Sequence, residues 1–327
     1  MAENKFHTLD LSSYSFLVTG GAGFIGSHIS GYLLRHNARL VRVFDNLSTG
    51  FEINIKDFSG NKRFEFFKGD IAEEDDCKKA CAGIDFVFHQ AALGSVSRSI
   101  EFPLNTHRTN STGFINMLVA ARDAGVKKFL YASSSSVYGD EESLPKKENK
   151  TGNPLSPYAV SKVTNELYAA NFFRMYGIKT IGLRYFNIFG PGQSPAGPYA
   201  AVIPLFIEGM SEGKEIFIDG DGDQTRDFTY IDNAVQANIK AMFSDNTNSY
   251  GKVFNIAAGR NINLNQLAQL LGKMIGYDKS PGHRPPRKGD IRNSLADISL
   301  AQNHFGYMPE VSVEEGLQKT VEWFRNK

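Results

Sequence analysis

A tyrosine and a lysine four residues apart, Tyr158 and Lys162, are the side chains of this chain best suited to proton transfer. Both fall in the first turns of a helix expected to begin near Ser156, and a spacing of four places them on one helical face. A free phenol has a pKa of about 10, so a tyrosine that acts as a base near pH 7 needs a drop of roughly three units. A neighbouring cation lowers the pKa of an acid by about one to three units. The pair therefore predicts a general base beside a cation, although the same spacing also fits an ordinary surface pair.

Four consecutive serines, Ser133 to Ser136, follow an apolar run that ends the strand expected over 127–133. Hydroxyls at the carboxyl end of a strand face the cleft of an open sheet and can hydrogen-bond a substrate oxygen during proton transfer. The cluster indicates a hydroxyl that assists the tyrosine. A polar turn is the alternative, and the four serines cannot all be catalytic.

A glycine-rich turn lies between a short apolar run and a helical pattern, and it reads Thr19-Gly20-Gly21-Ala22-Gly23-Phe24-Ile25-Gly26. Gly20 lets the chain reverse, Gly23 lets a pyrophosphate approach the backbone, and Gly26 lets the helix press against the sheet. The helix then points its free N–H groups at the anion. A second apolar run ends at Asp45, about twenty residues on, where a carboxylate meets the ribose hydroxyls of a dinucleotide. The turn and the acid together predict a dinucleotide site.

The elements that must position these residues alternate between short apolar runs and helical patterns. Strands are expected over 15–19, 39–45, 63–68, 84–89, 127–133 and 179–185, and helices over 24–36, 74–82, 104–124 and 156–176. This rhythm predicts a parallel sheet with helices on both faces, whose ligands lie outside the carboxyl ends of the strands.

The rhythm breaks after about residue 183. Turn-rich segments cover 190–198 and 219–223, the segment 227–257 reads strand–helix–strand, and short helices are expected over 199–212, 263–275, 297–305 and 312–325. These patterns indicate a smaller lobe, with 227–257 returning to the main sheet, so that the two lobes frame one cleft.

Composition narrows the class of protein. The chain has 327 residues, 41% of them hydrophobic, and a net charge of +1 with scattered Lys and Arg, which argues against a nucleic-acid or anionic-membrane surface. No apolar run approaches the roughly 18 residues of a spanning helix, and the polar N-terminus has no secretory apolar region. Cys77 and Cys81 lack further ligands nearby and read as reduced cysteines rather than a metal site. We expect a cytoplasmic enzyme without a metal.

Four groups of residues resemble the extended short-chain dehydrogenase/reductase family over nearly the whole chain: Gly20-x-x-Gly23-x-x-Gly26, Asp45, Ser134-x-x-x-Tyr138-Gly139 and Tyr158-x-x-x-Lys162. Narrower segments are similar to the bacterial UDP-sugar 4-epimerases that prefer UDP-GlcNAc and UDP-GalNAc, and they cover 89–95, 154–162, 184–187, 199–204, 220–222, 226–228 and 289–292. The resemblance implies an α/β fold, with a Rossmann-type doubly wound parallel sheet that binds NAD over 1–183. It also implies a smaller α/β lobe, 184–226 and 258–327, that binds a UDP-sugar.

The resemblance also implies roles for individual residues. Ser134 aligns with the catalytic hydroxyl, Tyr158 with the base and Lys162 with the residue that anchors the nicotinamide ribose. The residues implied for NAD are Gly20, Gly23, Phe24, Ile25, Gly26, Asp45, Asn46, Asp70, Ile71, Gln90, Ala91, Ala92, Tyr158 and Lys162. Those implied for the sugar nucleotide are Gly94, Ser95, Ser135, Ser136, Asn187, Gln193, Arg226, Arg292 and Ser294. Asp45 favours NAD over NADP, because a carboxylate repels a 2′-phosphate.

The implied activity is 4-epimerisation of UDP-GlcNAc and UDP-GalNAc, and also of UDP-Glc and UDP-Gal, by transient oxidation at C4 and reduction on the opposite face. Ser294 aligns with a position that is bulky in relatives restricted to unacetylated hexoses, and a small residue leaves room for an N-acetyl group. Three departures bear on the choice of sugar: Pro191-Gly192 replaces a basic pair, Ser97 stands where proline is usual, and Asn293 where histidine is usual.

Three other activities stay open. Near relatives act on UDP-N-acetylhexosaminuronic acids. A 4,6-dehydratase needs an acid and a base where this chain has Ser135 and Ser136, and a non-enzymatic NAD sensor often lacks the tyrosine or lysine that this chain keeps.

The resemblance also implies a homodimer, paired through the helices expected over 104–124 and 156–176. Its seam would include Phe114, Met117, Leu118, Leu167 and Phe172, unless these residues form the core-facing side that every sheet-packing helix has.

Overall fold

A parallel sheet forms the larger lobe of this chain, whose computed structural model describes residues 5–196, 200–286 and 291–326. Its seven strands have the order β11-β6-β5-β4-β1-β2-β3, and all are parallel. Their bounds are β1 (Ser15–Thr19), β2 (Leu40–Asp45), β3 (Phe64–Lys68), β4 (Phe86–His89), β5 (Lys128–Ser134), β6 (Thr180–Tyr185) and β11 (Lys252–Ile256). The doubly wound α/β fold expected from the alternating pattern is confirmed.

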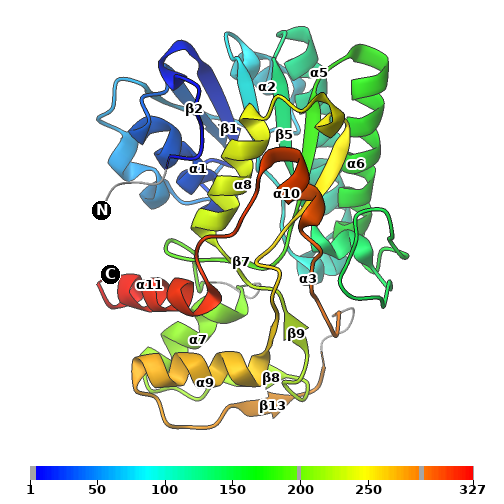
Figure 1. Cartoon of the computed structure of the whole chain (residues 1–327). Helices are drawn as coiled ribbons and strands as arrows, with labels where there is room; N and C mark the ends of the chain where they lie inside the picture. The colour runs from blue at the N-terminus through cyan, green and yellow to red at the C-terminus, as the bar shows by residue number, and fades with distance from the viewer. Residues whose placement is uncertain (1–4, 197–199, 287–290, 327) are drawn as a thin grey trace.

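Helices cover both faces of this sheet (Figure 1). Helices α1 (Phe24–Arg35) and α8 (Ile231–Phe243) lie on one face, and α2 (Glu74–Cys81), α5 (Gly113–Asp123) and α6 (Pro157–Tyr176) on the other. Along β1, Phe16 and Val18 point to the first face and Leu17 to the second, as the two-residue period of a strand requires. Because helices cover both faces of the sheet, all five residues of β1 are buried.

The helix expected over 104–124 is broken into three pieces. It consists of α4 (Pro103–His107), a wide π turn over Arg108–Thr112 and α5. Within the turn, the Asn110 side chain accepts a hydrogen bond from the backbone N–H of Leu93 at 2.8 Å and donates one to its carbonyl at 3.2 Å. The break therefore secures the segment after β4. A further helix, α3 (Val96–Glu101), begins at the N-cap Ser95 and was not expected.

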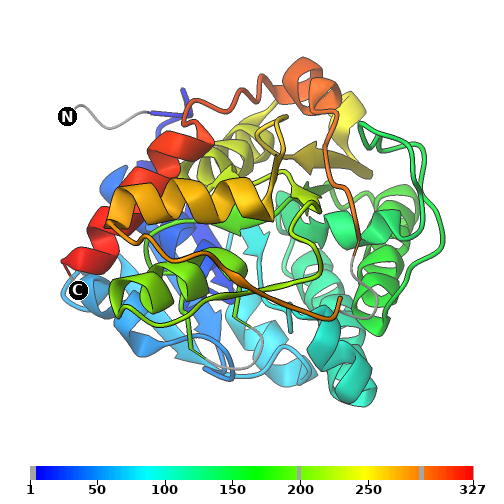
Figure 2. The same cartoon turned by 90° about the horizontal axis from the view of Figure 1, so that it is seen from below.

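The smaller lobe lies below the carboxyl ends of the strands. Figure 2 shows its helices side by side, and they are α7 (Val202–Ser211), α9 (Leu264–Ile275) and α11 (Val313–Arg325). Short strand pairs complete it: β7 (Ile188–Phe189) with β10 (Thr229–Tyr230), β8 (Phe217–Asp219) with β13 (Gly282–Arg284), and β9 (Thr225–Arg226) with β12 (Ile262–Asn263). Helix α10 (Ser299–Phe305) packs beside β11.

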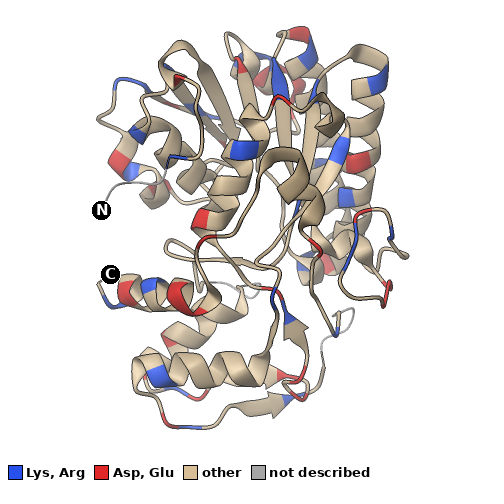
Figure 3. Ribbon diagram, viewed as in Figure 1, with Lys and Arg blue, Asp and Glu red and all other residues tan. Residues whose placement is uncertain are grey.

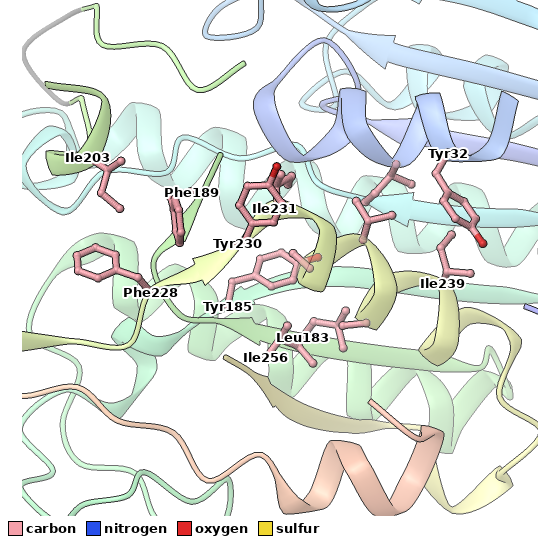
Figure 4. Packing of buried hydrophobic residues seen from close by; sticks show 14 of the residues in the cluster. Tyr32, Leu183, Tyr185, Phe189, Ile203, Phe228, Tyr230, Ile231, Ile239 and Ile256 are labelled. Atoms are coloured by element: carbon pink, nitrogen blue, oxygen red, sulfur yellow. The ribbon is translucent and has the colours of Figure 1, made fainter. Parts of the chain in front are cut away.

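One hydrophobic cluster runs from the sheet into the smaller lobe. Leu183 and Ile256 of the sheet and Ile239 of α8 belong to it, as do Phe189 and Phe228, which lie to their left in Figure 4. A continuous apolar core of this kind resists separation of the two lobes, because opening it would expose large aromatic side chains to water.

Lys and Arg are interspersed with Asp and Glu over both lobes (Figure 3), in keeping with the net charge of +1. Among the described residues, none of the helices combines the length and apolarity needed to cross a bilayer.

Four of the five residues considered for a dimer seam lie in the core instead. Phe114, Met117 and Leu118 are inaccessible and Phe172 nearly so, since they pack under the sheet, whereas Leu167 is 67% exposed.

Candidate active site

The glycine turn between β1 and α1 leaves space for a ligand backbone. Gly20 has φ = 64°, and a Cβ there would lie 2.7 Å from the backbone of Ala91. A Cβ on Gly26 would collide with the carbonyl oxygen of Gly20, so the helix can start this close to the turn only with glycine at that place. Gly23 is the N-cap of α1 and offers no side chain, which leaves the first N–H groups of the helix accessible to an anion.

Asp45 locks this turn from the end of β2. Its carboxylate accepts hydrogen bonds from the backbone N–H of Ala22 at 3.0 Å and from that of Leu47 at 2.8 Å. Burial raises the pKa of Asp45, while these two backbone hydrogen bonds lower it. A carboxylate oxygen has lone pairs beyond those two bonds, so Asp45 can also accept from the hydroxyls of a ribose.

A cavity of about 460 Å³ opens along the carboxyl ends of β1, β2, β4 and β5. Of the residues expected to bind NAD, it is lined by Gly20, Gly23, Phe24, Ile25, Gly26, Asp45, Asn46, Ile71, Gln90, Ala91, Ala92, Tyr158 and Lys162. The glycine cradle, the helix N-terminus and the ribose-facing carboxylate all fit a dinucleotide. Asp70 does not line the cavity: its carboxylate accepts a hydrogen bond from the backbone N–H of Ala72 and lies 3.8 Å from Arg108.

Several lining residues were not expected from the sequence. They include Ser48, Thr49 and Gly50 after β2, and Tyr185 at the end of β6. The Tyr185 hydroxyl donates to Gln90 at 3.2 Å, and it accepts a hydrogen bond from Asn238 at 2.8 Å. Residues 48–50 come soon after the strand predicted over 39–45, and Tyr185 ends the strand predicted over 179–185. Their place at the carboxyl edge of the sheet is the sequence signal that could have identified them.

Tyr158, Lys162 and Ser134 meet at the inner wall of this cavity. The Lys162 Nζ donates to the carbonyl of Ala132 at 2.7 Å and lies 5.8 Å from the centre of the Tyr158 ring. The Ser134 Oγ accepts hydrogen bonds from the N–H of Ser136 at 3.2 Å and from its hydroxyl at 2.9 Å. The serine is thereby oriented beside the phenol.

The pKa of Tyr158 runs against the expectation from its spacing to the lysine. Burial raises the pKa of this phenol, and only a hydrogen bond with Ser134 lowers it. Burial lowers the pKa of Lys162 to about 8, opposed by the charge of Glu166. Burial of Tyr158 therefore opposes ionisation of its phenol, and a positive charge nearby would favour it.

Two further cavities adjoin the first. One of about 190 Å³ is lined by Ser134, Ser135, Ser136, Gly139, Asn187, Arg226 and Ser294, among others. The other, of about 450 Å³, extends from Asn187, Gln193 and Arg226 into the smaller lobe, where Phe217, Phe228 and Leu264 supply apolar walls. Asn187 lines all three cavities, and Ser134 lines both the first and the smallest. The described residues around the smallest cavity include no Asp or Glu.

The remaining expected residues divide into two groups. Gly94 and Gln193 line the first cavity. Ser95 instead accepts a hydrogen bond from the N–H of Arg98 as the cap of α3, and the exposed Arg292 donates to Asp221 at 2.8 Å; neither lines the three cavities. The segments 199–204 and 289–292 are only partly covered, since Tyr199, Gly289 and Asp290 lie outside the described residues. Within the described part of the chain, no cluster of His, Cys, Asp and Glu could hold a metal ion.

The chain is similar to proteins of known class over nearly its full length. A model of the NAD dependent epimerase/dehydratase family matches residues 16–257. A UDP-glucose 4-epimerase of Thermotoga maritima, solved with UDP-glucose, is 40% identical with a TM-score of 0.90, covering 95% of this chain and 99% of that one. A UDP-N-acetylglucosamine 4-epimerase of Methanobrevibacter ruminantium, solved with UDP-N-acetylmuramic acid, is 38% identical with a TM-score of 0.90, covering 96% and 98%. A UDP-glucose 4-epimerase of Mycolicibacterium smegmatis is 36% identical over 318 residues, 95% of this chain and 98% of that protein.

Proposed function

Since this chain belongs to the NAD-dependent epimerase/dehydratase family, we propose that it interconverts UDP-GlcNAc and UDP-GalNAc by epimerisation at C4. The observation that carries the proposal is the place of Ser134 between the dinucleotide cavity and the smallest cavity, beside Tyr158. A sugar in the smallest cavity would lie next to the Ser134 hydroxyl and at the edge of the cofactor site that Tyr158 lines.

Tyr158, Ser134 and Lys162 divide the proton chemistry in this proposal. The chemistry that NAD supplies when bound is removal of a hydride from C4 and its return to the opposite face. Tyr158 takes the proton of the C4 hydroxyl, and Ser134 bridges that hydroxyl and the phenol. Lys162, fixed by the carbonyl of Ala132, supplies a cation beside the phenol and a donor for the nicotinamide ribose.

Arg226 and Asn187 hold the nucleotide in this proposal. Arg226 lines the two cavities that would contain the sugar and the UDP, so its guanidinium is placed for a diphosphate. The Asn187 amide donates to the backbone carbonyl of Asp227 at 3.2 Å, which ties the two segments together at the junction of the cavities. Holding the diphosphate while the ring turns keeps the 4-keto sugar from escaping.

Ser294 supports the choice of an N-acetylated sugar. This residue is 8% exposed and lines the smallest cavity together with Gly139, so two small residues form part of its wall. A large side chain in place of Ser294 would take the space of an N-acetyl group.

Two alternatives differ in what they require of the smallest cavity. Elimination of water by a 4,6-dehydratase needs an acid and a base near C5 and C6, and no carboxylate stands among the described lining residues. A uronic-acid substrate needs a cation for its carboxylate, and Arg226 is the cation among those residues. A test of the substrate therefore has to include the uronate.

An assay of purified protein with UDP-GlcNAc, UDP-GlcNAcA and UDP-Glc, followed by NMR without added NAD, tests the proposal. Formation of UDP-GalNAc, faster than any UDP-Gal, is the expected result. Turnover of UDP-GlcNAcA alone would show that the substrate is the uronate and that the reaction is still 4-epimerisation. No turnover of the three, even with added NAD, would overturn the assignment as a 4-epimerase.

We also propose that two copies of the chain pair through α4 and α6, which lie side by side. The seam is formed by exposed apolar side chains rather than by the core residues of α5. Leu104 is 82% exposed, and Val160, Leu167 and Met175 follow one face of α6 at 49%, 67% and 68%. Apolar residues repeating at i, i+7 and i+15 are typical of a helix face that is covered.

A further inference from the structure

Glu166 lies one turn after Lys162 on α6 and is held rigidly from behind the proposed site. Arg184 of β6 donates to both of its carboxylate oxygens, from Nε at 2.9 Å and from Nη2 at 2.8 Å. Ser133, next to the catalytic serine, donates to the same carboxylate. The side chains of Arg184 and Glu166 are only 5% and 12% exposed, so this bidentate pair is shielded from water and salt.

We propose that Glu166 is a positioning residue of the proposed site, whose fixed negative charge keeps the buried Lys162 protonated while the reaction runs. This inference rests on the proposed function. Lys162 is 3% exposed, and an ammonium group so deep in the protein is destabilised unless an opposite charge faces it. Residues four apart on a helix are neighbours on one face, so Glu166 meets that need.

The other groups around Lys162 do not supply a negative charge. His89 of β4 stays neutral, because burial lowers its pKa to about 3 with a further contribution from Lys162. Tyr131 of β5 and Tyr185 of β6 are buried phenols whose pKa values are raised, so both are neutral. Tyr158 on α6 is neutral until it takes up its role as the base, and Arg184 is already paired. Glu166 is thus the carboxylate that opposes the burial of Lys162 in the described part of the site.

A purely structural role for Glu166 makes a different prediction. If the Glu166 carboxylate served only to neutralise Arg184, then removing both charges would restore the wild-type pKa of Lys162 and the wild-type pH profile. If Glu166 acts on Lys162, the fall in the pKa of Lys162 persists after the Arg184 side chain has been replaced too, since the lysine still lacks its carboxylate partner. Glu166→Gln leaves Arg184 unpaired and can weaken the fold, so the double variant Glu166→Gln/Arg184→Met is the second test.

Glu148 offers a matched control. Its carboxylate is also half-buried and accepts a hydrogen bond from the backbone N–H of Asn255. Burial raises the pKa of Glu148, while this hydrogen bond and the charge of Arg184 lower it. Glu148→Gln therefore removes a neighbouring negative charge of similar burial that does not face Lys162.

The first readout does not require turnover. Holoprotein labelled with ¹³C at the lysine Cε is titrated by NMR, and Lys162 is identified by its absence from Lys162→Met. We expect the pKa of Lys162 to fall by about one unit or more in Glu166→Gln and in the double variant, but not in Glu148→Gln. An unchanged titration in both Glu166 variants would overturn the proposal.

The second readout is the pH profile of kcat/KM for C4 epimerisation. The alkaline limb of this profile should move to lower pH in both Glu166 variants, by as much as the pKa of Lys162 falls in the NMR titration. Activity at pH 9 relative to pH 7 then falls about tenfold for each pH unit by which the limb moves. A wild-type alkaline limb in the double variant would overturn the proposal in favour of the structural role. If the protein turned over no UDP-sugar, the proposed function would fail, and the NMR titration would still decide the role of Glu166.

Discussion

Burial disfavours the two charged groups that the proposed chemistry needs, the phenolate of Tyr158 and the ammonium group of Lys162. It raises the pKa of the Tyr158 phenol and lowers that of the Lys162 ammonium. A positive charge near the phenol, such as that of an oxidised nicotinamide, would offset part of the effect of burial on Tyr158. In the proposed function, binding of the cofactor would therefore favour ionisation of this tyrosine.

Replacing Tyr158 by Phe should abolish the base and little else. The hydroxyl contacts Ser134 and faces the cavity, so the ring packing stays intact. We expect turnover of UDP-GlcNAc to fall by roughly 10²- to 10⁴-fold, the usual contribution of a general base, with an unchanged melting temperature. Tyr168→Phe, an outward-facing change on the same helix, serves as the control. Near-normal turnover in Tyr158→Phe would exclude this tyrosine as the base.

Enlarging Ser294 should change the choice of sugar. A tyrosine side chain at this place would fill part of the 190 Å³ cavity, which has to accept the N-acetyl group. We expect Ser294→Tyr to lower kcat/KM for UDP-GlcNAc about tenfold or more relative to UDP-Glc. Ser299→Tyr, on the exposed first turn of α10 and outside the three cavities, should leave the ratio of the two substrates unchanged. An equal loss on both substrates would show that Ser294 does not discriminate between them.

Among the elements, those with strong periodicity could be predicted and the short ones could not. The six strands expected up to residue 185 match β1 to β6 within two residues at each end. The pairs β8–β13 and β9–β12 were missed, since strands of two or three residues have no measurable period and their partners are far apart in the sequence. The break over Arg108–Thr112 was also missed, because Asn110 stabilises it through the distant Leu93.

The candidate site was predictable to the extent that it follows strand ends. The glycine turn directly follows β1, and Asp45 and Ser134 end β2 and β5, so the topology brings them together. Asp70 and Ser95 lie in the segments after β3 and β4, but their side chains accept hydrogen bonds from nearby backbone N–H groups and do not line the three cavities. Whether a polar residue caps its own turn or faces a ligand depends on local geometry that the sequence pattern does not contain.

Asp227 fixes the strand that carries Arg226. It is inaccessible to solvent, and its carboxylate accepts hydrogen bonds from the backbone N–H of Ala258 at 2.9 Å and of Ala296 at 3.2 Å. Three segments of the smaller lobe are thereby joined at one side chain. Burial raises the pKa of Asp227 to about 7, although these hydrogen bonds lower it.

This buried acid predicts a pH dependence of stability. The folded state holds the proton more tightly than the unfolded state, so the contribution of Asp227 to the unfolding free energy is full below about pH 4 and is lost as the pH rises through about 7. Denaturant unfolding of wild type and Asp227→Asn over this range should show their difference in unfolding free energy shrinking as the pH rises, by at most about 1.4 kcal/mol per pH unit. A difference that grows with pH would contradict the raised pKa.

At the scale of the whole molecule, the two lobes share one apolar core while three cavities follow their boundary. Phe189 and Phe228 belong to that core, and the neighbouring Asn187 lines all three cavities. In the proposed function, substrate and cofactor meet along this boundary, which the core holds together. The lobes are then expected to stay apposed during turnover, with the ring of the sugar rather than a domain providing the movement.

The exposed face of α4 and α6 is the second feature at this scale, and α6 lies at the outer edge of the molecule (Figure 1). Leu104 is 82% exposed and Leu167 is 67% exposed, and burial of each against a second copy would stabilise a dimer. We expect sedimentation at twice the chain mass of 36.2 kDa for the wild type. The Leu104→Asp/Leu167→Asp variant should shift to the monomer, because it places like charges in the seam. Ile53→Asp changes an equally exposed apolar residue outside α4 and α6, so this variant should remain a dimer. A monomeric wild type would show that the chain does not form this dimer. A double variant that still sediments as a dimer would show that the contact lies elsewhere.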